Sequence, residues 1–100
     1  MFRLLKDDQQ LSFTVEREDA KFGDGSRVLF WIDMELRMLQ RGRQEYIPID
    51  SVDAFVVSGS GELMARMGSE EMVLYDGSPE QGEELNAAAD ELNQWCGLQG

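Results

Sequence analysis

Hydrophobic and polar residues alternate along much of the N-terminal half of the chain. In the segment LSFTVE, residues 11–16, every second side chain is hydrophobic. A period of two is typical of a strand with one buried face. The apolar residues 2–5 precede this segment, and the polar sequence DDQQ separates the two. The pattern therefore predicts a hairpin of two strands, over about 2–6 and 11–18.

The longest alternation, over residues 27–40, permits two interpretations. From Val28 to Met38 every second residue is hydrophobic, which predicts one long strand over 27–40. The same residues also place hydrophobic side chains at helical spacing, with Ser26 as a cap and Gly42 as a stop, so a helix is the alternative. The unbroken alternation and the β-favouring beginning VLFWI favour the strand.

Turn sequences divide the next part of the chain into short strands. RGR at 41–43, GSG at 59–61 and GSE at 68–70 are typical of tight connections. Pro48 has no N–H to donate to a sheet, so it belongs at a strand end or an edge. The strands predicted from this punctuation are 44–49, 52–57, 62–67 and 71–75.

The chain ends in a predicted helix over 79–96. Ser78, Pro79 and Gln81 form a capping box with proline at the first helical position. Gly97 ends the helix, and Leu98 is placed to fold back in a Schellman motif. One stripe at helical spacing is apolar and consists of Leu85, Ala88, Ala89, Leu92 and Trp95.

Together these elements predict a mainly β protein with one C-terminal helix. One hundred residues are the size of a single domain, 1–100, with seven antiparallel strands. A sheet of that size has to close or curl to hide its inner face and edges, and an amphipathic helix suits an open end. If residues 27–40 are helical instead, the class becomes α+β.

Two segments resemble bacterial members of the pleckstrin-homology-like (PH-like) family. They are IPIDSVDAFVV at 47–57 and LYDGSPE at 74–80, and the resemblance extends over residues 44–98. It implies a seven-stranded bent barrel capped by the helix. Lipid-binding members carry basic residues in the first hairpin loop, where this chain has KDDQQ at 6–10. Two carboxylates there oppose an anionic headgroup, so the resemblance implies protein binding and no membrane.

Charge is distributed unevenly along the chain. Residues 1–43 hold eight basic and eight acidic side chains, whereas residues 44–100 hold twelve acids and one base, Arg66. The net charge of −11 repels nucleic acid and attracts basic protein surfaces. We therefore expect no direct contact with nucleic acid and a protein partner with a basic surface.

Catalytic chemistry finds little support in the composition. The chain has no histidine, which removes the commonest general base and zinc ligand. Its one cysteine, Cys96, follows a tryptophan in the predicted helix and is expected to be a buried hydrophobe. A lone cysteine without a signal sequence predicts a cytoplasmic protein. We expect no catalytic residue, cofactor or metal; an enzyme that uses carboxylates alone is the least favoured alternative.

The predicted function is that of a non-enzymatic module or accessory subunit that docks a protein partner. The alternative is an acidic mimic of nucleic acid that inhibits a DNA- or RNA-binding protein. A second copy of the chain is a further candidate partner, with the arginines of one copy against the acidic half of the other. The candidate partner-binding residues are the outward-facing Trp31, Leu29 and Leu39, the basic Arg37, Arg41 and Arg43, and the helix-front acids Glu80, Glu83 and Glu84.

Overall fold

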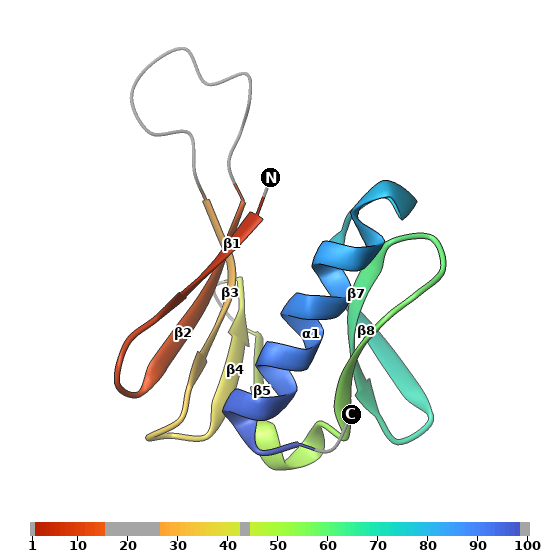
Figure 1. Ribbon diagram of the computed structural model, residues 1–100. Coiled ribbons are helices and arrows are strands. Elements are labelled where there is room, and N and C mark those ends of the chain that lie inside the picture. The colour runs from red at the N-terminus through yellow and green to blue at the C-terminus, as the bar shows by residue number, and fades with distance from the viewer. Residues whose placement is uncertain (1, 16–26, 43–44, 99–100) are drawn as a thin grey trace. The chain divides into compact units, whose positions relative to one another are not determined.

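A computed structural model describes residues 2–15, 27–42 and 45–98. Within these ranges the chain forms a five-stranded sheet, a three-stranded sheet and one C-terminal α-helix (Figure 1). The predicted mainly β class with a C-terminal helix is therefore confirmed. The seven-stranded barrel is not confirmed, because the described strands form two separate antiparallel sheets.

The chain divides into two compact units, Met1–Ile47 and Pro48–Gly100, and each is described by itself. That the whole chain acts as one domain stays a prediction.

The N-terminal unit is a meander in which each strand pairs with the next along the chain, in the order β1-β2-β3-β4-β5. The first hairpin lies where the sequence predicts it. Its first strand has the predicted bounds, and its second strand begins one residue earlier than predicted and is described as far as Val15. The strands are β1 (Phe2–Lys6), β2 (Gln10–Val15), β3 (Arg27–Asp33), β4 (Met38–Arg41) and β5 (Glu45–Pro48).

The single strand predicted over 27–40 is wrong, and so is the alternative helix. A turn over 34–37 separates β3 from β4. Asp33 causes the break: its Oδ1 accepts hydrogen bonds from the N–H groups of Glu35 at 3.0 Å and Leu36 at 3.2 Å. Aspartate commonly stabilises a turn in this way, in competition with the strand ladder. Arg37 completes the turn with a left-handed φ of 52°.

The inner face of the N-terminal sheet carries its buried hydrophobic residues. Leu11 and Phe13 are buried and Ser12 between them is half-buried, as the period of two predicted, but the alternation breaks at a register shift, where Thr14 is buried as well. Phe13 stacks on Phe30 of β3 with ring centroids 5.0 Å apart, and on Phe2 at 5.1 Å. The completely buried side chains of this sheet are Leu11, Phe13, Phe30, Ile32 and Leu39.

The C-terminal unit consists of a three-stranded sheet in the order β6-β7-β8 followed by the helix. Helix α1 lies against β6, and buried hydrophobic side chains come from both the helix and the strands. The elements are η1 (Ile49–Ser51), β6 (Ala54–Val57), β7 (Glu62–Met67), β8 (Glu70–Asp76), η2 (Pro79–Gln81) and α1 (Gly82–Cys96).

Both predicted ends of the C-terminal helix are confirmed. The N–H of Ser78 donates to Oε1 of Gln81 at 3.1 Å, and a 3₁₀ turn leads into α1. At the other end Gly97 adopts a φ of 72°, which glycine reaches without steric cost. Its N–H donates to the Gln94 carbonyl, and the Leu98 N–H donates to that of Asn93, at 3.2 and 2.7 Å. These two bonds define a Schellman motif.

A buried asparagine joins the helix to the sheet. Asn93 accepts a hydrogen bond from the Phe55 N–H at 2.7 Å and donates one to the Phe55 carbonyl at 3.0 Å. Strand β6 lies at one edge of the described three-stranded sheet, so Asn93 binds backbone groups that have no neighbouring strand in that sheet. The amide therefore occupies, at Phe55, the place of a further strand and protects the edge from unwanted pairing.

Candidate functional site

The outer face of the N-terminal sheet carries a row of side chains that crosses all five strands. Leu5 lies opposite Ser12, Ser12 opposite Trp31, and Trp31 opposite Gln40. Directly paired residues of an antiparallel sheet point to the same face. Gln40 Nε2 donates to the Tyr46 hydroxyl at 3.2 Å, which extends the row to β5. We call these five residues the outer row.

Two hydrophobic side chains of the outer row are exposed, and a third is half-buried. Leu5 is 51% exposed and Tyr46 is 56% exposed, while Trp31 between them is half-buried. Large aliphatic and aromatic side chains on one face present apolar area that water solvates poorly. The outer row is therefore a partly apolar surface of this unit that is accessible to other molecules.

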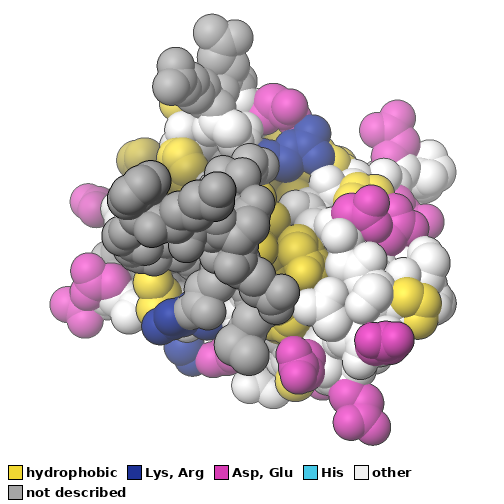
Figure 2. Space-filling model, turned by 90° about the horizontal axis from the view of Figure 1, so that it is seen from above, with side chains coloured by type: hydrophobic (Ala, Val, Ile, Leu, Met, Phe, Trp, Pro, Cys, Tyr) yellow, Lys and Arg dark blue, Asp and Glu magenta, His cyan; other side chains and the backbone are white. Residues whose placement is uncertain are grey.

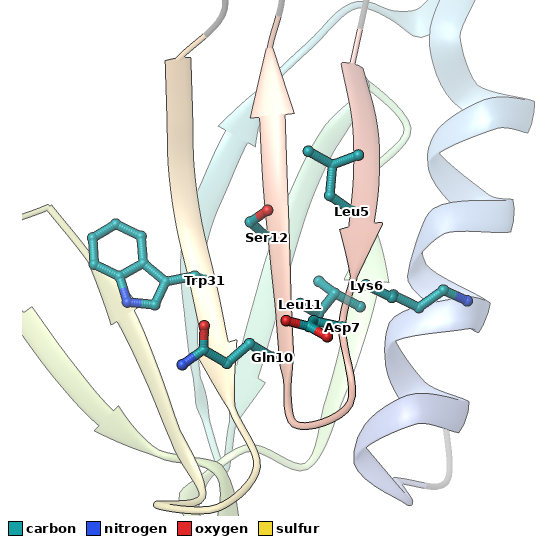
Figure 3. A pocket seen from close by; sticks show the side chains of 7 residues that line it. All are labelled: Leu5, Lys6, Asp7, Gln10, Leu11, Ser12 and Trp31. Carbon is teal, nitrogen blue, oxygen red and sulfur yellow. The ribbon is translucent and has the colours of Figure 1, made fainter.

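A hollow of about 170 Å³ lies beside the outer row, next to the β1–β2 turn. Figure 3 shows Ser12 between Leu5 and Trp31, and the indole of Trp31 lies face-on to the viewer and extends to the side of β3 away from Ser12. The lining residues are Leu5, Lys6, Asp7, Gln10, Leu11, Ser12 and Trp31.

The polar groups of the hollow present mainly hydrogen-bond acceptors. Gln10 Nε2 donates to Asp33 Oδ2 at 3.4 Å, and Oε1 of the same amide lies on the side of Ser12 (Figure 3). The Asp8 N–H donates to Asp7 Oδ1 at 2.8 Å and holds that carboxylate at the rim. The ammonium of Lys6 points away from Trp31 in the same view. Such a site can hold a group rich in donors beside an aromatic side chain.

The three hydrophobic residues predicted to face outward do not share one surface. Trp31 lies on the outer row as predicted, and Leu29 is half-buried. Leu29 stands at a register shift, since Phe30 pairs with Phe13 but Val28 pairs with Thr14.

For Leu39 the prediction is wrong. The turn over 34–37 resets the register, so that Leu39 lies opposite Ile32 and is completely buried. The outward position assumed an unbroken strand from residue 27 to residue 40.

The structure describes two of the three arginines of the predicted basic cluster, Arg37 and Arg41. Arg37 precedes β4 and Arg41 ends it, so their Cα atoms are about 13 Å apart along the strand. Arg41 forms an ion pair with Glu45 at 2.6 Å, on the surface of the sheet. Arg43 lies outside the described residues, so its place in such a cluster stays a prediction.

The helix-front acids lie where they were predicted. Glu80 is in η2, and Glu83 and Glu84 are in the first turn of α1, all three exposed. Negative charge is favoured there by the helix dipole, so a structural reason suffices for their presence. Figure 2 shows Asp and Glu side chains at several places on the face that it draws.

Of the seven residues that line the hollow, only Trp31 is among the predicted site residues. From the sequence alone, Leu5 and Ser12 are assigned only to strands, and Asp7 is considered only as a carboxylate that opposes an anionic headgroup. A signal existed: in the predicted hairpin of 2–6 with 11–18, Leu5 falls opposite Ser12. The position of Trp31 next to them needed the pairing of β2 with β3.

Metal binding, membrane insertion and comparisons with known proteins do not indicate a function for the described residues. Among the described residues no group of three or more Asp, Glu, Cys or His side chains is arranged to hold a metal ion. Within the same ranges no helix is long and apolar enough to cross a membrane. Cys96 is buried at the end of α1. Comparisons with protein-family models, curated proteins and solved structures give no match.

Proposed function

We propose that the protein is a non-enzymatic interaction module that docks a protein partner through the outer row and its hollow. The observation that carries this proposal is the position of Trp31, half-buried on the outer row between the exposed Leu5 and Tyr46. Tryptophan and tyrosine contribute disproportionately to binding at protein interfaces. A hollow beside such an anchor offers a place for one side chain of the partner.

The PH-like fold remains part of this proposal. It is supported by the order of the elements, in which antiparallel strands joined by short turns are followed by a C-terminal helix. In this interpretation the β1–β2 turn is the loop with which lipid-binding members grip phosphates. Here that turn places the Asp7 carboxylate at the rim of the hollow, which favours a protein over an anionic lipid.

Site-specific photo-cross-linking in the cells that make the protein tests the docking surface. A photoreactive phenylalanine analogue replaces Leu5 or Tyr46 of the outer row, and Val73 of β8, which is 37% exposed, is the control position. We expect the same partner protein to be captured from positions 5 and 46, and not from 73. Trp31→Ala should remove both adducts. Equal capture from position 73, or adducts that survive Trp31→Ala, would refute the docking surface.

The nucleic-acid mimic is the second candidate, favoured by the composition of the C-terminal unit. Residues 48–100 hold eleven acids and one base, Arg66, a formal charge of −10. A mimic should displace DNA from a DNA-binding protein, and its affinity should fall steeply with salt as counterions are exchanged. Docking through an aromatic anchor depends much less on salt. Competition at two salt concentrations therefore separates the docking module from the mimic. In the photo-cross-linking experiment, an adduct between two copies of the chain would identify self-association instead.

A further inference from the structure

We infer that the hollow beside Trp31 receives one arginine side chain of the partner protein. The inference rests on the proposed docking function and specifies the chemistry of its central contact. Three features of the hollow support it: an aromatic side chain in its lining, a set of hydrogen-bond acceptors and a negative charge at the rim.

Trp31 lines the hollow, and the face of its indole is turned towards the viewer in Figure 3. A guanidinium group is planar and weakly hydrated, so it stacks on an indole and gains a cation–π attraction. Leu5, which also lines the hollow, can pack against the methylene stem of the same side chain.

The acceptors are Gln10 Oε1, the Ser12 hydroxyl oxygen and the Asp7 carboxylate. Gln10 Nε2 donates to Asp33 while Oε1 lies on the side of Ser12, and the Asp8 N–H holds Asp7 through Oδ1. Arginine carries five N–H donors in a fixed planar fork and no acceptor, which is the complement of this set. A charge-assisted bond to Asp7 strengthens the contact.

Size and charge disfavour the other occupants. The space of about 170 Å³ suits the six heavy atoms of an arginine side chain beyond Cβ, rather than a cofactor or a nucleotide. An anion would meet the Asp7 carboxylate and the net charge of −11. A purely apolar side chain would cover the oxygens of Gln10 and Ser12 without replacing their bonds to water. Lys6 does not oppose a cation, because its ammonium points away from Trp31.

Peptide titration of the full ¹⁵N-labelled chain, followed by NMR, tests the inference. The probe is acetyl-Gly-Gly-Arg-Gly-Gly-amide, and matched peptides carry norleucine, lysine or glutamate in place of arginine. We expect the Trp31 indole N–H signal to shift with a Kd in roughly the millimolar range, as one side-chain contact provides. The Trp95 indole is the internal reference. The norleucine peptide should bind about tenfold more weakly, and the glutamate peptide should not bind.

Variants separate the arginine site from a general attraction to negative charge. Asp7→Asn should weaken binding about fivefold. Asp90→Asn, which removes the same charge from an exposed position on α1, should leave Kd unchanged. Trp31→Leu should abolish the contact while preserving bulk, and Trp31→Phe should retain part of it. A dispersed NMR spectrum establishes that each variant is folded.

Several outcomes overturn the inference. They are equal affinity for the norleucine and arginine peptides, no effect of Asp7→Asn, or equal losses from Asp7→Asn and Asp90→Asn. The cross-linking experiment tests the docking function independently of the arginine site. If the outer row captures a partner but the arginine peptide does not bind, only the arginine site is wrong. If the peptide binds but no partner is captured, the docking function is wrong.

Discussion

Replacing Asn93 tests how much one buried amide stabilises the C-terminal unit. Asn93→Leu keeps the branched shape and the number of heavy atoms, although leucine is larger, and removes both hydrogen bonds to Phe55, at 2.7 and 3.0 Å. Asn93 is only 6% exposed, so water replaces these bonds poorly. A buried backbone group without a partner costs about 1–3 kcal/mol.

We expect Asn93→Leu to lower the free energy of unfolding by about 2–4 kcal/mol. The two lost bonds leave one donor and one acceptor of Phe55 to partial hydration, while the new leucine gains a little from burial. Since domains unfold with only about 5–15 kcal/mol, this is a large fraction of the total. For a chain of this size the midpoint of thermal unfolding should fall by roughly 10–25 °C.

Urea denaturation followed by circular dichroism measures the change, and the slope with urea shows whether unfolding stays two-state. Asn86→Leu is the matched control on the same helix, because the Asn86 side chain is exposed and donates to the Gly82 carbonyl at 2.8 Å. It should cost no more than about 0.5 kcal/mol. Hydrogen exchange gives a local reading, since the Phe55 amide should lose protection relative to its neighbours. A loss below about 0.5 kcal/mol for Asn93→Leu, or equal losses in the two variants, would refute this role of the amide.

Three further substitutions test particular backbone and side-chain positions by the same urea method. Gly61→Ala should lower the free energy of unfolding by several kcal/mol, because a Cβ there would lie 2.1 Å from the Ser78 carbonyl oxygen at a φ of 88°. Gly68→Ala is the control, because Gly68 has a φ of 63° and open space around it, and this change should cost only about 1–2 kcal/mol. Equal losses in the two variants would contradict the close contact at Gly61. Asp33→Ala should lower the free energy of unfolding by about 1 kcal/mol, because it removes the acceptor of two turn amides. Asp33→Asn keeps a side-chain oxygen and should retain most of that stability. Equal losses in the two variants would show that the turn does not depend on that oxygen. Thr14→Val should be neutral or stabilising by up to about 1 kcal/mol, because among the described residues the buried Thr14 hydroxyl has no hydrogen-bond partner; a clear loss of stability would show that it has one.

The features that the sequence predicts well are local ones. The capping interaction of Ser78 with Gln81, the Schellman stop at Gly97 and the first hairpin each depend on residues within a few positions of one another. Their geometry follows from side-chain chemistry and backbone freedom, which a single sequence carries. The mainly β class follows from the same kind of pattern.

The features that were missed depend on one residue overriding a pattern or on contacts between distant segments. Asp33 was counted as one polar position of a long strand, although its carboxylate ends that strand and moves Leu39 to the inner face. Asn93 was not predicted to be buried, because its partner Phe55 is 38 positions away. The hollow likewise requires β1, β2 and β3 to be paired in register before Trp31 meets Ser12 and Leu5.

The division of charge coincides with the division of the chain into units. Residues 1–47 hold eight basic and nine acidic side chains, a formal charge of −1, whereas residues 48–100 carry −10. The outer row and the hollow belong to the nearly neutral unit, so the single carboxylate of Asp7, rather than the acidic surface, supplies the specific charge of the proposed contact. If the proposed docking is right, the acids of the other unit act at longer range by repelling anionic molecules and attracting a basic partner, and salt screens this attraction at separations beyond about 8–10 Å. On this division of roles, salt should slow the association of the partner, while changes to Trp31 and Asp7 should mainly accelerate its dissociation.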